Sequence, residues 1–178
     1  MSDDLKATDL APASEKTLRV IVEESDKRIA AQVQVMLATD SRSNTLLSAA
    51  AALAAAAFGV AASQYPTQGL SPLVVGSAVF ALSAAIAALA AVHALWPADI
   101  DVQGWSPKLF VEDLASAKSN HDLLTEIAAL NQSKSDGNAR CNKMIAGRVK
   151  RSMAALALAP IFGALAAILR ILLPSCGA

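Results

Sequence analysis

Cationic side chains gather in one stretch of the chain and could bind a phosphate group. The stretch comes just before the last apolar segment and contains Arg140, Lys143, Arg148, Lys150 and Arg151. Guanidinium and ammonium groups are the side chains that proteins use against phosphate. Three interpretations stay open: a topological signal beside a membrane span, contact with anionic lipid, and a site for a phosphate-bearing ligand. For the ligand site, the candidate residues are Arg140, Lys143 and Arg148.

No arrangement of residues predicts catalysis or metal binding. His93 falls at the edge of an apolar segment and His121 at an expected helix start, where structural roles are more common than catalytic ones. Carboxylate pairs occur with spacings that are common on solvent-exposed helix faces: Glu23-Glu24, Glu112-Asp113 and Asp122/Glu126. No GxxxxGK[ST] or GxGxxG run is present to bind a phosphate, and no Cys/His spacing fits a metal. We therefore expect no catalytic residue, no metal, no cofactor and no enzymatic activity.

The composition indicates a membrane protein. Hydrophobic residues make up 54% of the 178 positions and charged residues only 17%, and the mean hydropathy is +0.44. The 15 Lys and Arg balance the 15 Asp and Glu, so the net charge of zero predicts no binding to nucleic acid. Charged residues are absent from residues 43–98 and again from residues 152–169. A soluble domain rarely continues so far without a surface charge.

The uncharged segments predict three spans. About 20 apolar residues cross a bilayer, so residues 43–98 are long enough for two crossings. Pro66 and Gly69 lie in a polar stretch that predicts a turn, with spans near 45–63 and 72–95 and a transmembrane hairpin over 45–95. A third transmembrane helix is predicted over 152–173 with Pro160 inside it. A buried or interfacial helix is the alternative for this third segment.

The positions of Lys and Arg set the expected orientation. Every Lys and Arg except Arg170 lies either before the hairpin or between the hairpin and the third span. Because cytoplasmic loops hold the excess of positive charge, the N-terminus and the 96–151 segment are expected inside, and residues 174–178 form an external tail. The first span is expected to serve as the insertion signal. Cys141 and Cys176 would then lie on opposite sides, without an intrachain disulfide.

The remaining segments predict cytoplasmic helices. Residues 1–13 are expected to be a disordered acidic tail, and residues 14–44 a cytoplasmic amphipathic helix. Its apolar stripe is Leu18, Ile21, Val22, Ser25, Ile29, Val33, Met36 and Leu37. This stripe either packs on the other cytoplasmic helix or forms a self-association seam.

Residues 96–151 predict a cytoplasmic helical segment, with a loop to 107, a short helix over 108–119, and a long helix from about 120 that continues into the third span. The apolar positions of that long helix are Leu124, Ile127, Leu130, Cys141, Ile145 and Val149.

Small residues in the spans would let helices approach one another closely, as interfaces buried in lipid do. Gly59, Ser63, Gly76, Ser77 and Ser83 are examples, beside many alanines. We therefore expect a homo-oligomer in contact with membrane lipid.

The layout of the chain also carries a resemblance. Asp40-Ser41-Arg42-Ser43 precedes the first span, and Phe110 to Asp113, Leu123 to Lys134 and Asn142-Lys143 precede the last one. This order resembles the Pycsar transmembrane effectors and related two-span effector domains, over about residues 15–173. Ser43 stands where the family usually has alanine, and residues 133–138 are more polar than is usual. The resemblance does not identify the residues that hold a nucleotide.

The resemblance implies a multi-pass protein of the bacterial inner membrane, encoded beside a cyclase. Such a protein is an antiphage defence effector that senses a cyclic pyrimidine nucleotide, cUMP or cCMP, and disrupts inner-membrane integrity. From the residues themselves we expect an all-α membrane protein with three transmembrane helices and cytoplasmic amphipathic helices. The alternative function is a non-enzymatic membrane anchor or scaffold that binds a cytoplasmic partner. A membrane-embedded enzyme is disfavoured, because no polar residues converge in the spans.

Overall fold

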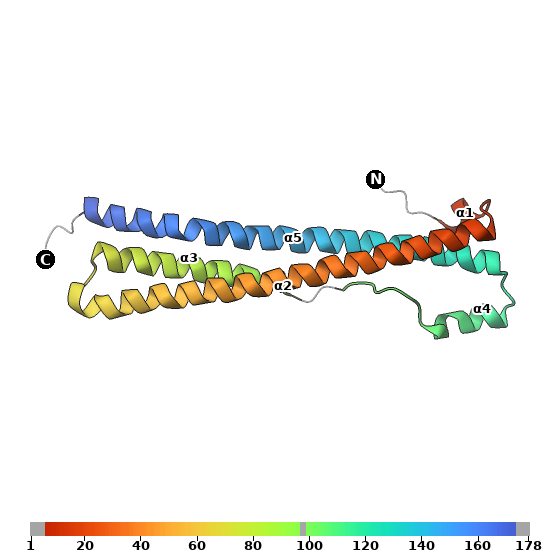
Figure 1. The fold of residues 1–178 in the computed structure, drawn as a ribbon, viewed down its shortest axis with the longest axis horizontal. Coiled ribbons are helices and arrows are strands. Elements are labelled where there is room, and N and C mark those ends of the chain that lie inside the picture. Colours follow the sequence, from red (N-terminus) through yellow and green to blue (C-terminus); the bar gives the residue numbers. More distant parts are fainter. Residues whose placement is uncertain (1–5, 97–98, 174–178) are drawn as a thin grey trace. The chain divides into compact units, whose positions relative to one another are not determined.

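The structure is a computed structural model that describes residues 6–96 and 99–173, and this part of the chain contains helices and loops but no strand (Figure 1). The elements in chain order are α1 (Ala7–Leu10), α2 (Glu15–Gln68), α3 (Pro72–Ala94), the 3-10 helix η1 (Pro107–Phe110), α4 (Val111–Ala115) and α5 (Asn120–Leu172). The predicted all-α fold is confirmed. Three of these helices, α2, α3 and α5, contain a stretch long and apolar enough to cross a membrane.

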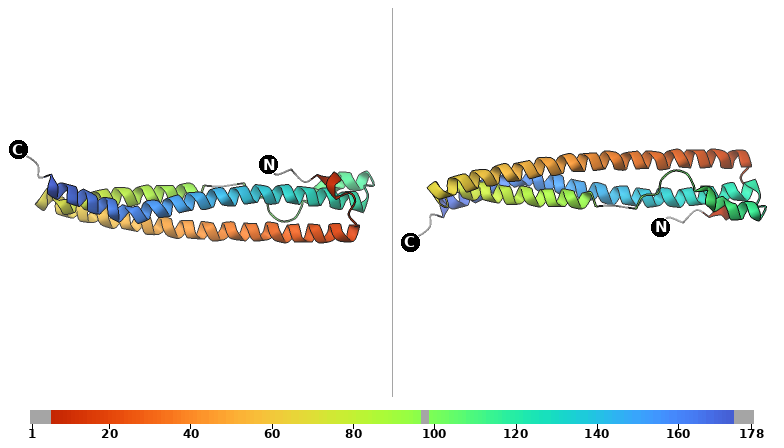
Figure 2. Two further views of the ribbon diagram at one scale, coloured as in Figure 1. Left: turned by 90° about the horizontal axis from the view of Figure 1, so that it is seen from above. Right: turned by 90° about the horizontal axis from the view of Figure 1, so that it is seen from below.

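The chain packs as two compact units. Of the described residues, 6–38 and 99–144 form the first unit, and 39–96 and 145–173 form the second. The first unit contains α1, η1, α4 and the N-terminal parts of α2 and α5. The second contains α3 and the C-terminal parts of α2 and α5, and α3 runs beside both of them in each view (Figure 1, Figure 2).

The second unit buries small residues and exposes large apolar ones. The buried residues of α3 are Val74, Gly76, Ala81, Ala84, Ala87, Ala91 and Ala94, which recur at helical spacing. Leu82 and Leu89 of the same helix are 64% and 70% exposed. In water this arrangement would be unfavourable, whereas in lipid the large side chains are solvated and the small ones permit close helix contact. The chain is therefore a multi-pass membrane protein with three candidate spans.

Two glycines set the contact between α3 and α5. The backbones approach so closely at Gly76 and Gly163 that a Cβ added to either would lie 3.0 Å from the carbonyl oxygen of the other. Further along the same two helices, the buried hydroxyl of Ser152 donates a 2.8 Å hydrogen bond to the carbonyl of Ala87. Pro160 lies inside α5 without ending it. Close backbone approach therefore holds these helices together where large side chains would keep them apart.

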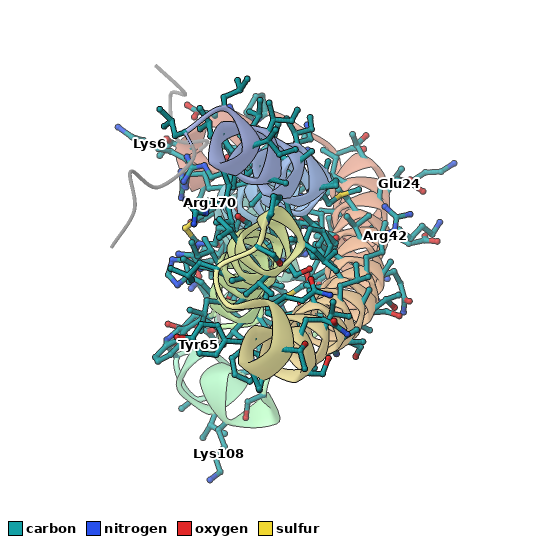
Figure 3. The ribbon with its side chains drawn as sticks, turned by 90° about the vertical axis from the view of Figure 1, so that its left-hand side faces the viewer. Lys6, Glu24, Arg42, Tyr65, Lys108 and Arg170 are labelled. Atoms are coloured by element: carbon teal, nitrogen blue, oxygen red, sulfur yellow. The ribbon has the colours of Figure 1, made fainter. Side chains whose placement is uncertain are left out.

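The turn between α2 and α3 is shorter than predicted. Helix α2 includes Pro66 and continues to Gln68, so the turn begins only at Gly69. Gly69 takes a φ of +56°, a conformation that favours glycine, and Ser71 caps α3 by accepting from the Val74 N–H. Arg170, which Figure 3 labels, lies near the C-terminal end of α5, and its Nε donates to the Leu70 carbonyl over 2.8 Å.

The structure corrects two expected boundaries. The amphipathic helix of residues 14–44 and the first span form one helix, α2, without a break near residue 44. The tail expected to be disordered over 1–13 contains α1, where the Asp9 carboxylate accepts from the Lys6 N–H over 2.9 Å and thereby stabilises the first turn. Residues 1–5, the expected external tail at 174–178, and Cys176 lie outside the described residues. Cys141 is a free thiol.

Candidate functional site

The three candidate cations are divided between the two units. Arg140 and Lys143 lie three positions apart on α5 in the first unit, and both are exposed. Residues at this spacing share one face of a helix, so their charges lie side by side. Arg148 belongs to the second unit, where its guanidinium donates to the His93 carbonyl over 3.3 Å. Arg140 and Lys143 therefore form a pair, and Arg148 has a contact of its own in the membrane-spanning unit.

The first unit buries a polar face of α5, which we call the polar seam, together with the apolar side chains of Leu18 and Ile29 of α2. The seam consists of Asn131, Ser135, Asn138 and Asn142, at steps of four, three and four residues. Such steps keep residues on one side of a helix, the side that is usually apolar in packed helices. Asn131, Ser135 and Asn138 are each only 1% exposed. Amide and hydroxyl groups thus fill the helix contact where apolar residues were predicted.

Asn131 connects three parts of the first unit. Its amide nitrogen donates to Ser25 Oγ and Asp26 Oδ1 of α2, both over 2.9 Å. Its amide oxygen accepts from Trp105 Nε1 of the loop before η1 over 3.2 Å. Lys134 lies 3.6 Å from the centroid of the same indole ring, as a cation–π contact, and donates to the Gly104 carbonyl. One buried amide therefore orients α2, α5 and the loop.

Asn138 holds the beginning of the same loop. Its amide oxygen accepts from the Asp101 N–H over 3.0 Å, and its amide nitrogen donates to the Asp101 carbonyl over 2.8 Å. This two-bond pairing copies the way in which neighbouring strands pair. Gly137 beside it lies inside the continuous helix α5, and a Cβ added there would lie 3.9 Å from a carboxylate oxygen of Asp101. The polar run of residues 131–138 is thus a packing surface of an unbroken helix.

The C-terminal end of the seam is incompletely hydrogen-bonded. Gln32 of α2 donates to the carbonyl and the hydroxyl oxygens of Ser135, at 3.0 and 3.1 Å. Asn142 donates to the Gln32 carbonyl over 3.1 Å. The amide oxygens Gln32 Oε1 and Asn142 Oδ1 are both buried without a hydrogen-bond partner. A buried acceptor without a donor costs about 1–3 kcal/mol. The present packing therefore leaves unused hydrogen-bonding capacity at two neighbouring amides.

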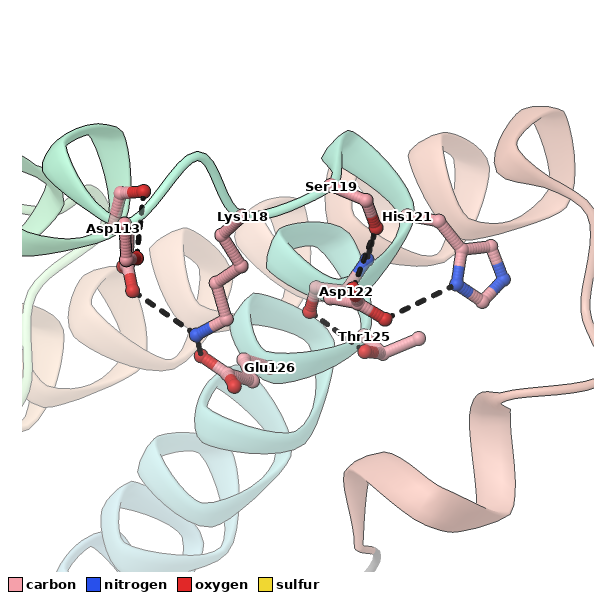
Figure 4. Close-up of polar contacts among 8 residues, drawn as sticks. Asp113, Lys118, Ser119, His121, Asp122, Thr125 and Glu126 are labelled. Carbon is pink, nitrogen blue, oxygen red and sulfur yellow. Dashed lines mark hydrogen bonds and ion pairs between the residues drawn. The ribbon is translucent and has the colours of Figure 1, made fainter.

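An ion cluster lies at the start of α5 in the first unit. Lys118 pairs with Glu126 of α5 and with Asp113 of α4, as Figure 4 shows. Hydrogen bonds to Glu126 and then to Asp113 raise the pKa of Lys118 above its ordinary value, so it stays charged. The Ser119 hydroxyl accepts from the Asp122 N–H and caps α5. The cluster therefore fixes the start of α5.

His121 lies in the first turn of α5, at the predicted helix start. Its Nε2 lies 3.0 Å from the Ala13 carbonyl, ahead of α2, and its Nδ1 lies 3.9 Å from Asp122 Oδ1 (Figure 4). In the described residues no group of three His, Cys, Asp or Glu side chains is arranged to hold a metal. The ring therefore ties α5 to the segment that precedes α2.

Sequence reasoning missed the seam because it looked for apolar positions. Leu130, one of the apolar positions named for the long helix, is 49% exposed, and its neighbour Asn131 is buried instead. The spacing could have revealed the seam. The polar residues at 131, 135, 138 and 142, followed by Ile145 and Val149, recur at alternating steps of four and three, which place all six on one face of α5. Both of these apolar residues are buried.

Comparison of the chain with known protein families, curated proteins and solved structures finds no match.

Proposed function

We propose that the chain is a non-enzymatic membrane effector of antiphage defence. In this proposal the first unit lies in the bacterial cytoplasm and senses a cyclic pyrimidine nucleotide, cUMP or cCMP, and the spans respond by disrupting the inner membrane. The observation that carries it is the polar seam, because the seam joins α2 to α5 and both helices also contain a candidate span. A rearrangement of the seam would thus act on helices that enter the bilayer.

A seam of amides is suited to switching between two arrangements. Hydrogen bonds between polar side chains contribute only about 0.5–1.5 kcal/mol each, so partners can be exchanged at low net cost. Gln32 Oε1 and Asn142 Oδ1 lack partners now, and a second arrangement that supplies them with donors would recover the cost of burying them. A ligand shifts such an equilibrium by its difference in affinity for the two arrangements. We propose that the nucleotide changes this packing and thereby the association of the first span with its neighbours.

The phosphate of the nucleotide needs a cation, and Arg140 and Lys143 are an exposed pair that flanks Asn142 of the polar seam in the sequence. The variant Arg140→Glu/Lys143→Glu replaces two attractions to phosphate by two repulsions. We expect it to abolish the loss of membrane potential that cUMP or cCMP causes in cells making the intact protein. The measurement is the fluorescence of a potential-sensitive dye after the nucleotide is produced in the cells.

A matched control separates a binding site from a general effect of charge. Lys16 and Arg19 are also exposed, belong to the first unit and lie three positions apart on α2. Lys16→Glu/Arg19→Glu changes the net charge equally and should keep the full response. If Arg140→Glu/Lys143→Glu still depolarises cells, these residues are not the site. If neither nucleotide depolarises cells that make the intact protein, the effector function is wrong and the membrane anchor takes its place.

The proposed orientation makes a separate prediction. Reporter fusions after residues 44 and 130 should be active in the cytoplasm, and fusions after 68 and 178 in the periplasm, because the Lys and Arg residues flank the spans on one side. Paired alkaline phosphatase and green fluorescent protein fusions measure this directly. A periplasmic signal from the fusion after residue 130 would contradict the orientation and place the polar seam in the periplasm.

A further inference from the structure

The second unit contains a cavity of about 650 Å³ between α2 and α5. Its polar lining includes Arg42, Thr45 and Lys150, and its apolar lining includes Leu46, Val149 and Met153. The volume falls within the 300–1,000 Å³ that is typical of small-molecule sites. On each helix the lining residues recur about once per helical turn, so one face of α2 and one face of α5 form the two walls.

The two cations of the cavity lie where the charged part of each helix ends. After Arg42 the next charged residue is Asp99, and after Lys150 only Arg151 precedes the uncharged residues 152–169. Such a position corresponds to the headgroup level of a bilayer, because the uncharged stretches that follow have the length of a span. Within the described part of the chain, neither Arg42 nor Lys150 takes part in an ion pair, and both are exposed. The cavity therefore presents two uncompensated positive charges.

The rest of the lining is apolar and continues into the spans. Leu46 lies one turn beyond Arg42, and Met153 nearly one turn beyond Lys150, both toward the uncharged stretches. A free phosphate or a nucleotide would pair with the cations but has no methylene chain to contact these apolar side chains. A ligand with an anionic phosphate at one end and methylene groups at the other would satisfy both parts.

We propose that this cavity binds an anionic glycerophospholipid. Arg42 and Lys150 pair with its phosphate, Thr45 lies beside the glycerol region, and Leu46, Val149 and Met153 contact the first methylenes of an acyl chain. The lipid then lies between α2 and α5 at the point where both helices enter the membrane. This site is independent of the proposed nucleotide response, since it requires only that the second unit is embedded in lipid.

Native mass spectrometry of the full chain tests the site. The purified protein is titrated with phosphatidylglycerol and with phosphatidylcholine of the same acyl chains, and the bound lipid is counted. We expect one tightly held phosphatidylglycerol. Arg42→Gln/Lys150→Gln should weaken its binding about 30-fold, since each interfacial cation contributes roughly fivefold. Ala146→Leu, which fills the cavity without changing its charge, should weaken phosphatidylglycerol binding as well.

The control removes two cations that do not line the cavity. Arg28→Gln/Arg151→Gln takes one exposed charge from α2 and one from α5, the second directly beside Lys150, and should change the affinity less than twofold. Equal losses in the cavity pair and the control pair would overturn the proposal, because binding would then depend on general surface charge. Equal affinity for the two lipids would overturn it too. Displacement of the lipid by millimolar inorganic phosphate would identify a simple anion site in place of the lipid site.

Discussion

Gly163→Val is expected to give a protein whose second unit unfolds at a markedly lower temperature. A Cβ at position 163 would lie 2.9 Å from the Cβ of Phe80 and 3.0 Å from the carbonyl oxygen of Gly76. Neither neighbour is the flexible end of a side chain, so α3 and α5 must move apart. Overpacking of this kind costs about 1–3 kcal/mol, and valine adds two more methyl groups beyond the Cβ. We expect a loss of about 3 kcal/mol, or roughly 6–12 °C in Tm.

Thermal unfolding of the protein in detergent, followed by circular dichroism, measures this loss. The matched controls are Gly59→Ala in α2 and Gly147→Ala in α5, where an added Cβ meets nothing within 4 Å. Both should leave Tm unchanged or raise it slightly, because alanine favours helix over glycine by about 1 kcal/mol. If Gly163→Val melts like the controls, the close contact of α3 and α5 at Gly76 is wrong.

The helices that enter the membrane could be predicted because their signal is physical and long. The uncharged stretches at 43–98 and 152–169 favour lipid over water as their surroundings, and Ser71-Pro72 gives α3 a defined start. The predicted second span, 72–95, agrees with α3 to one residue. The predicted end of the first span, near residue 63, was less accurate, because Pro66 suggested a turn. Pro66 lies in the last turn of α2, where it removes one backbone hydrogen bond, and the helix ends two residues later at Gln68.

The polar seam could not be read from residue types alone. Asn131 and Asn138 are equally suited to a solvated surface, a turn or a buried contact, and only their partners decide between these. Those partners, Asp26 and Asp101, lie more than thirty residues away in sequence. The pair of Arg140 and Lys143 was identifiable from charge, whereas the contact of Arg148 with a backbone carbonyl of α3 depends on helix packing. The homo-oligomer stays a prediction.

Asn131→Leu is expected to have the largest effect on the first unit. Leucine has as many side-chain heavy atoms as asparagine, but it removes two N–H donors and one carbonyl acceptor from a position that is 1% exposed. Trp105 Nε1, Ser25 Oγ and Asp26 Oδ1 would all lose this partner. Each buried polar group left unpaired costs about 1–3 kcal/mol, and more when it is charged, so we expect a loss of at least 3 kcal/mol.

Trp105 itself can report this loss. The chain has two tryptophans, so a Trp96→Phe background leaves Trp105 as the single indole, and its emission should shift to longer wavelength as the loop leaves α5.

Gln132→Leu is the matched control, because the Gln132 amide donates only to Asp136 one turn along the same helix. It should change stability by less than about 0.5 kcal/mol. If both variants unfold at the same denaturant concentration, the seam does not hold the unit together. If only Asn131→Leu loosens the loop, a single buried amide links α2, α5 and residues 99–106, which is the coupling that a ligand-driven rearrangement of the seam requires.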